Sequence, residues 1–158
     1  RKPDDWKVPD VTQATVHAIF VAAIYDGIAR AARDWLVKFL KERVPANLGA
    51  PLATLPRMQE VAGGIEARLA VNARLIDSFA SDFDNGFPLS AIESNIIKLT
   101  VTNNAAAVVE DALSLTSNHG LSRTNPLERH YRDVLCGRVH TPQDDSTRVA
   151  AGRFALGV

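Results

Sequence analysis

The chain has 158 residues with 18 basic and 18 acidic side chains, so its formal net charge is zero. This length supports one domain with a substantial core, and 46% hydrophobic residues are too many for a disordered chain. Neutrality argues against a nucleic-acid partner, no apolar run approaches the ~20 residues of a membrane span, and a single cysteine, Cys136, fits a cytoplasmic protein without disulfides.

The first predicted element is a long helix from Val11 to Val44. Its apolar residues recur at alternating steps of three and four, which places them on one helical face. Pro9 and Pro45 bracket the run, and proline inside a helix would break it. We expect the aromatic residues of this face to lie in the core or in subunit contacts. The face consists of Ala18, Val21, Tyr25, Ile28, Ala32, Trp35 and Phe39.

Two more long helices are predicted after it. The second begins near Thr54, a candidate cap, and ends at Asn85-Gly86, while the third runs from Pro88 to about Ser117. Each carries one stripe of mostly apolar residues. The second stripe is Met58, Val61, Ile65, Leu69, Asn72, Ile76, Phe79 and Phe83. The third stripe is Ile92, Ile96, Leu99, Asn103, Ala106, Val109 and Leu113.

Two shorter helices complete the prediction. Residues 125–128, Asn-Pro-Leu-Glu, combine a capping asparagine, a proline and a glutamate, which predicts a helix that ends near Gly137. Residues 141–144, Thr-Pro-Gln-Asp, repeat the pattern and open a final helix that Gly152 ends. No segment alternates with a period of two for long enough to be a strand. The sequence therefore predicts an all-α, up-and-down four-helix bundle over residues 1–158, with a short C-terminal helical extension.

The familiar catalytic and metal-binding motifs are mostly absent. There is no phosphate loop, nucleophile elbow or calcium loop, and the histidines lack metal-ligand spacing, so no metal site is expected. Arginines gather near the C-terminus, where composition alone favours a solvated face with helix salt bridges. Two such pairs are Arg129 with Asp133 and Glu128 with Arg132. The four histidines are His17, His119, His130 and His140.

The order of residues carries a family resemblance. Residues 119–133 read HGLSRTNPLERHYRD: a glycine turn, a proline, an acidic–basic pair and an Arg-Asp dipeptide. This stretch resembles the C-terminal helical domain of acyl-CoA dehydrogenases. Residues 27–32 and 41–43 are similar to the first long helix of that domain. Residues 137–144, GRVHTPQD, look closest to the flavin-dependent monooxygenase branch of that superfamily, which includes dibenzothiophene monooxygenase.

The resemblance implies a flavoenzyme with two upstream domains, in which FAD (or FMN) lies between domains and between subunits of a homodimer or homotetramer. It implies that Arg43 contacts the flavin. It places Asn118, His119 and Gly120 at a turn that approaches the flavin of a neighbouring subunit, and it assigns Gln143 to the cofactor contacts. A dinucleotide flavin carries a pyrophosphate, which favours a fixed guanidinium and exposed backbone N–H groups.

The base of a standard dehydrogenase is missing at both family positions. In many members a glutamate follows the Arg-Asp dipeptide by eight residues, where this chain has Thr141, and other branches place it near His17. His140 is the better candidate for catalysis, because an imidazole titrates near pH 6.5 and can accept a proton. The resemblance to the monooxygenase branch places it beside the flavin ring.

The leading functional hypothesis is the C-terminal domain of a monooxygenase that uses reduced flavin and O₂ on a small-molecule substrate, with a flavin reductase as partner. One alternative is an acyl-CoA dehydrogenase whose base lies elsewhere. Another alternative, of a different class, is a non-catalytic oligomerisation bundle. We expect the chain alone to be inactive and to self-associate.

Overall fold

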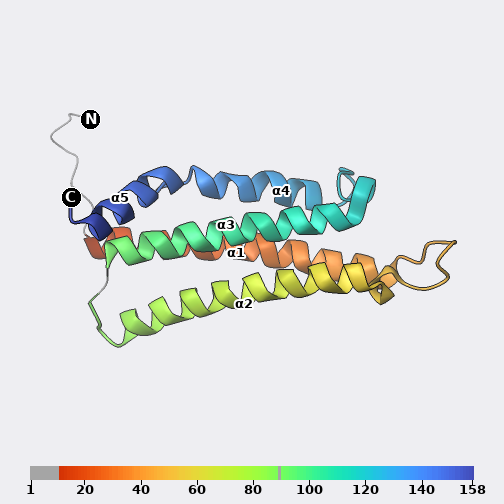
Figure 1. Ribbon diagram of the computed structural model, residues 1–158, viewed down its shortest axis with the longest axis horizontal. Helices are drawn as coiled ribbons and strands as arrows, with labels where there is room; N and C mark the ends of the chain where they lie inside the picture. Colours follow the sequence, from red (N-terminus) through yellow and green to blue (C-terminus); the bar gives the residue numbers. More distant parts are fainter. Residues whose placement is uncertain (1–10, 89) are drawn as a thin grey trace.

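The structure, a computed structural model, describes residues 11–88 and 90–158, so Pro9 lies outside the described residues. The first four α-helices alternate in direction, and the fifth continues in the direction of the fourth, so that these two follow one another along the third helix on the side away from the second (Figure 1). No strand occurs in the described ranges, and the all-α, up-and-down prediction is confirmed. The long and short α-helices are α1 (Val11–Glu42), α2 (Pro56–Asp84), α3 (Ala91–Thr116), α4 (Leu127–Leu135) and α5 (Asp144–Leu156). Single 3-10 turns are η2 (Leu52–Thr54), η3 (Ser117–His119) and η4 (Cys136–Arg138).

The core forms where α1 packs along α3. On α1 the predicted stripe is correct in its first half, where Ala18, Val21 and Tyr25 are buried. In its second half Trp35 and Phe39 are only partly buried, and the buried residues there include Leu36 and Leu40. On α3 the predicted stripe is partly wrong: Ile96 is 40% exposed, whereas Ile97 is buried. The physical reason is that α1, α2, α4 and α5 all contact α3, so this helix is covered on several faces and no single stripe describes it. Its buried apolar residues are Ile97, Val101, Ala105, Ala106, Val108, Val109 and Ala112.

Polar residues join the three long helices at one level of the core. The amide of Asn72 on α2 donates to Asp26 Oδ1 on α1 at 2.9 Å, and Asn104 on α3 donates to Asn72 Oδ1 at 2.9 Å. Arg30 completes the group with a 2.6 Å bond to the second oxygen of Asp26. Asn72 is fully buried, so each of these bonds satisfies a group that water cannot reach.

The helix ends correct several predicted boundaries. Thr54 does not cap α2; the cap position is Leu55, without a side-chain bond. Ser90, rather than Pro88, precedes α3, and its hydroxyl accepts a hydrogen bond from the Glu93 N–H at 3.2 Å. The cap position of α4 is Pro126, one residue after the predicted Asn125, although the side chain of Asn125 accepts from the N–H of residue 127 at 3.0 Å.

The start of α5 differs most from the prediction. Thr141 does not cap this helix, because the cap position is Gln143 and the helix begins at the next residue. Gly152 lies inside α5, which continues to Leu156 and ends where Gly157 adopts a left-handed conformation. Two ion pairs were expected in α4, and only Glu128 with Arg132, at 3.0 Å, is formed among the described residues.

One described helix, α1, is long and apolar enough to cross a membrane by length and composition alone. An 18-residue window within it reaches a mean hydropathy of 1.2. Of that window, 44% is buried inside the bundle, where α1 contacts α2, α3 and α4. A buried core helix satisfies the same criterion.

Candidate functional site

The predicted catalytic residue, His140, lies in the connection between η4 and α5, where it meets two side chains of α1. Its Nδ1 is 3.2 Å from the hydroxyl of Tyr25, and the two rings meet edge to face with centroids 6.0 Å apart. The ring of His17 lies 6.2 Å from the ring of His140, also edge-on. Three side chains that can carry a proton therefore gather at one place.

The backbone around His140 holds the imidazole toward α1. The His140 N–H donates to the Cys136 carbonyl at 3.0 Å, which continues the turn of η4. Gly137 is buried, and a Cβ there would lie 3.1 Å from Thr102 Cβ and 3.4 Å from Tyr25 Cδ1. Because glycine has no Cβ, the chain passes close to both α1 and α3 before it reaches His140.

The pairing of Tyr25 with His140 supports either direction of proton transfer. Burial, with smaller contributions from the charges of Cys136 and Asp133, raises the pKa of the Tyr25 phenol, so the phenol stays protonated at neutral pH. When Tyr25 donates to Nδ1, Nε2 carries the proton and can donate it. When Nδ1 carries the proton and donates to the phenol oxygen, Nε2 is free to accept one.

The other predicted contacts lie at the far end of α1. Arg43 follows α1, and its exposed guanidinium has no hydrogen bond or ion pair among the described residues. The ring of His119, at the end of α3, lies 5.5 Å from that of Phe39, which brings Arg43 and the 117–120 turn to the same end. Arg43 is 18 residues along the chain from Tyr25, a distance of about 27 Å at the helical rise.

Two residues predicted to contact the cofactor have a different structural setting. Gly120 is buried, and a Cβ there would collide with Thr116 Oγ1 and approach Leu127 Cδ2 to 3.3 Å. Its lack of a side chain therefore serves packing between α3 and α4, and its contact with a flavin stays a prediction. Gln143 is exposed beside His140, and its carbonyl accepts from the Thr147 N–H at 3.0 Å.

The predicted site residues thus divide into two groups. Arg43, Asn118 and His119 present exposed donors at one end, and this donor set fits the phosphates of a flavin nucleotide. His140 and Gln143 lie near the middle of the bundle and fit a reacting group rather than a phosphate. Among the described residues, no cluster of three or more His, Cys, Asp or Glu side chains is arranged to hold a metal ion.

The contact between Tyr25 and His140 was missed by sequence reasoning. Tyr25 was expected in the core, and it is buried there, but its hydroxyl also reaches His140. His17 was given an ordinary helical role. A signal did exist: residues 17, 21 and 25 are spaced by four, so His17 and Tyr25 share a helical face.

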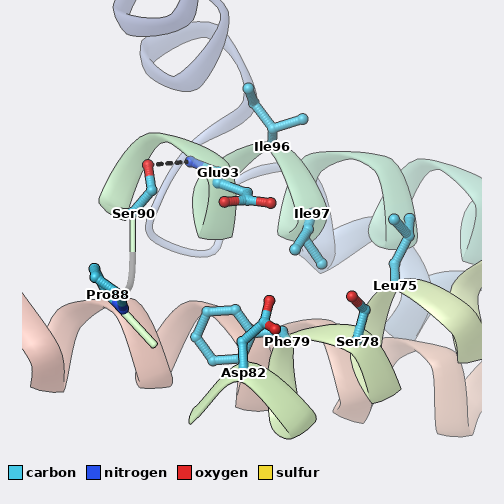
Figure 2. Close-up of a pocket in the computed structure, with 9 residues that line it drawn as sticks. All are labelled: Leu75, Ser78, Phe79, Asp82, Pro88, Ser90, Glu93, Ile96 and Ile97. Atoms are coloured by element: carbon cyan, nitrogen blue, oxygen red, sulfur yellow. Dashed lines mark hydrogen bonds between the residues drawn. The ribbon is translucent and has the colours of Figure 1, made fainter. Parts of the chain in front are cut away.

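A separate pocket of about 210 Å³ lies where α2 ends and α3 begins (Figure 2). Its polar lining includes Asp82 from α2 and Glu93 from α3, while Phe79 and Ile97 form apolar walls. None of the predicted site residues lines it. It is therefore distinct from both groups described above.

Comparisons with known proteins agree with this architecture. Residues 10–146 match the family described as acyl-CoA dehydrogenase, C-terminal domain. The chain is 36% identical over 140 residues to YdbM of Bacillus subtilis, a protein named as an acyl-CoA dehydrogenase, covering 86% of this chain and 37% of that protein. It is 34% identical over 157 residues to L-evernosamine nitrososynthase of a Micromonospora species, covering 91% of this chain and 35% of that enzyme.

The fold is shared with a solved structure as well. Butyryl-CoA dehydrogenase from Megasphaera elsdenii superposes with a TM-score of 0.84 at 23% identity, covering 92% of this chain and 37% of that one. The chain thus spans a little over a third of the length of the proteins it matches.

Proposed function

We propose a reaction for this protein from one premise: the chain belongs to the acyl-CoA dehydrogenase family, of which it forms the C-terminal helical domain. It is a domain of a flavin-dependent oxidoreductase of that family. The proposal is that the whole protein oxidises an acyl-CoA thioester with FAD, and that His140 takes the proton a carboxylate takes in other members. The contact between His140 and Tyr25 is the observation that carries this proposal.

The chemistry requires one group to accept a proton from the carbon next to the thioester carbonyl. FAD, when bound, accepts the hydride from the neighbouring carbon. Nε2 of His140 takes the proton while Nδ1 donates to the oxygen of Tyr25, which fixes the ring and its tautomer. Thr141, at the family position of the glutamate, has no group that titrates near neutral pH, so the preceding histidine supplies the base.

The cofactor contacts follow from the two groups of residues. Arg43, Asn118 and His119 would hold phosphate oxygens, because they present donors at an exposed end of the bundle. His140 lies about 27 Å from that end along α1, so one chain would contribute phosphate-binding residues and a base to two separate regions of the assembled enzyme. Such an arrangement favours an enzyme whose site is completed by its upstream domains and by a second subunit.

The test compares His140→Ala with the wild-type full-length enzyme, using an acyl-CoA substrate and an artificial electron acceptor. A positioned base supplies roughly 10²–10⁴-fold in rate, so we expect kcat to fall by about that factor while flavin affinity stays within threefold. His130→Gln serves as the matched histidine control and should leave kcat nearly unchanged. A rate for His140→Ala within twofold of wild type would refute the role of His140.

A second candidate is oxygenation by reduced flavin and O₂, as GRVHTPQD suggested. Two observations favour it: Thr141, preceded by His140, stands at the family position of the carboxylate, and the 34% identical relative is named a nitrososynthase rather than a dehydrogenase. The relatives named for acyl-CoA chemistry favour the first candidate. If the full-length protein consumes O₂ with a flavin reductase and does not turn over acyl-CoA, oxygenation becomes the preferred function over dehydrogenation.

A further inference from the structure

Lys98 is the most unusual buried side chain of the bundle. It lies on α3 with no exposed surface, and lysine is seldom fully buried unless it is paired. Burial lowers the pKa of its amine, and the negative charge of Asp144 opposes that shift. An ammonium group in this position needs strong partners, and the partners it has define its role.

The partners of Lys98 are the two ends of the segment that carries His140. Its Nζ donates to the Gly137 carbonyl at 2.5 Å and lies 3.5 Å from Asp144 Oδ1. The second oxygen of Asp144 accepts from the amide of Asn103, also on α3, at 2.9 Å. Residues 137 and 144 are therefore both attached to α3 through one buried charge.

Between these two attachments the segment has few other anchors. The N–H groups of Val139 and His140 bond to the Cys136 carbonyl at 3.2 Å and 3.0 Å, and the imidazole reaches Tyr25. A segment held only by local turns would place the ring less accurately. Errors of about 1 Å in a reacting group can cost roughly a hundredfold in rate.

We propose that Lys98 is a positioning residue for His140, which it holds by binding the Gly137 carbonyl and the Asp144 carboxylate together. This inference rests on the proposed role of His140 as the base. Lys98 does not touch substrate itself, because its ammonium group is enclosed by α3, η4 and α5. It acts through the backbone of residues 137–144.

The test uses the full-length enzyme with Lys98→Met, which keeps an unbranched apolar chain and removes the charge. The matched control is Val109→Ala, a fully buried change on the same helix that leaves segment 137–144 untouched. Two measurements are made below the melting temperature of both variants: steady-state kinetics, which gives kcat and KM, and hydrogen exchange of the peptide covering residues 137–144. We expect Lys98→Met to lower kcat 10- to 100-fold with KM changed less than threefold, and to speed exchange in that peptide more than tenfold.

Val109→Ala should leave kcat and the exchange rate of that peptide within about twofold of wild type. A folded Lys98→Met enzyme with unchanged kcat and unchanged exchange would overturn the proposal. Should Lys98→Met fail to fold, Asn103→Leu is the second variant: it removes the amide that donates to Asp144 at 2.9 Å and to the Leu99 carbonyl of its own helix at 2.7 Å, and it leaves Lys98 in place. The same two effects are expected at a smaller size, and no effect on either would again overturn the proposal. If His140→Ala keeps its rate, the proposed function fails, while the exchange measurement still decides whether Lys98 holds the segment.

Discussion

Replacement of Gly120 by alanine tests whether this glycine serves the packing of the bundle or the binding of a ligand. The new Cβ would collide with the Thr116 hydroxyl and lie 3.0 Å from Leu113 Cδ2 and 3.3 Å from Leu127 Cδ2. The hydroxyl cannot turn away freely, because it bonds to carbonyls of its own helix at 3.0 and 3.1 Å. Leu127 is fully buried, so it has little space to move. Overpacking of this kind costs about 1–3 kcal/mol.

The expected result is a fall in the melting temperature of the 158-residue chain. For a chain of this length each kcal/mol corresponds to about 2–4 °C, so Gly120→Ala should melt about 2–12 °C below wild type in circular dichroism. Gly63→Ala is the control: Gly63 is helical with no atom within 4 Å of a new Cβ, so alanine should stabilise α2 by about 0.5–1 kcal/mol. An unchanged melting temperature for Gly120→Ala, with flavin affinity lost in the full-length protein, would refute this reasoning.

Three more predictions concern the rest of the bundle. Asn72→Ala should lower the free energy of unfolding by about 2–3 kcal/mol in urea titrations, because it leaves Asp26 and Asn104 without their hydrogen bonds to this side chain. The control is the exposed loop residue Asn47, whose replacement by alanine should change the free energy of unfolding by no more than about 0.5 kcal/mol. Equal effects of the two substitutions would contradict this prediction. Burial, assisted by neighbouring Arg129, lowers the pKa of His130 below its ordinary 6.5, so the folded state binds fewer protons than the unfolded chain and stability falls as pH drops through 6.5. His130→Gln should remove that part of the pH dependence of the melting temperature, and a curve parallel to wild type would count against it. Finally, exposed apolar side chains such as Phe20, which is 66% exposed, predict that the isolated chain self-associates. A monomer found by light scattering at micromolar concentration would disprove this prediction.

Helix periodicity was predictable from the sequence where most contacts of a helix are with one neighbour, and helix starts were predictable where a local side chain accepts from the first turn. The stripe containing Ala18, Val21 and Tyr25 follows from the spacing of α1, which packs mainly along α3. The start of α4 was predicted to within one residue, because Asn125 accepts from the N–H of residue 127. Both depend on residues within a few positions of each other. Periodicity failed on α3, because a helix covered on several faces has no single apolar stripe to detect.

The candidate site was harder to predict because its contacts join distant parts of the chain. His140 could be selected from the sequence, but its bond to Tyr25 spans 115 positions, and periodicity does not reveal such contacts. The burial of Lys98 could not be predicted for a related reason: lysine is usually exposed, and the partner Asp144 is 46 residues away along the chain. The start of α5 was misjudged because Thr141-Pro142 imitates a helix start two residues before the observed one.

The polar group formed by Asp26, Asn72 and Asn104 also determines how far the long helices can slide past one another. Their core positions are mostly Ala, Val, Leu and Ile, so a shift of α2 by one turn, about 5.4 Å, would still match apolar residues with apolar residues. The same shift would separate the buried amide of Asn72 from Asp26 and Asn104, and it would leave Asp26 Oδ1 without its donor from α2. One level of hydrogen bonds therefore selects a single axial register of α2 against α1 and α3.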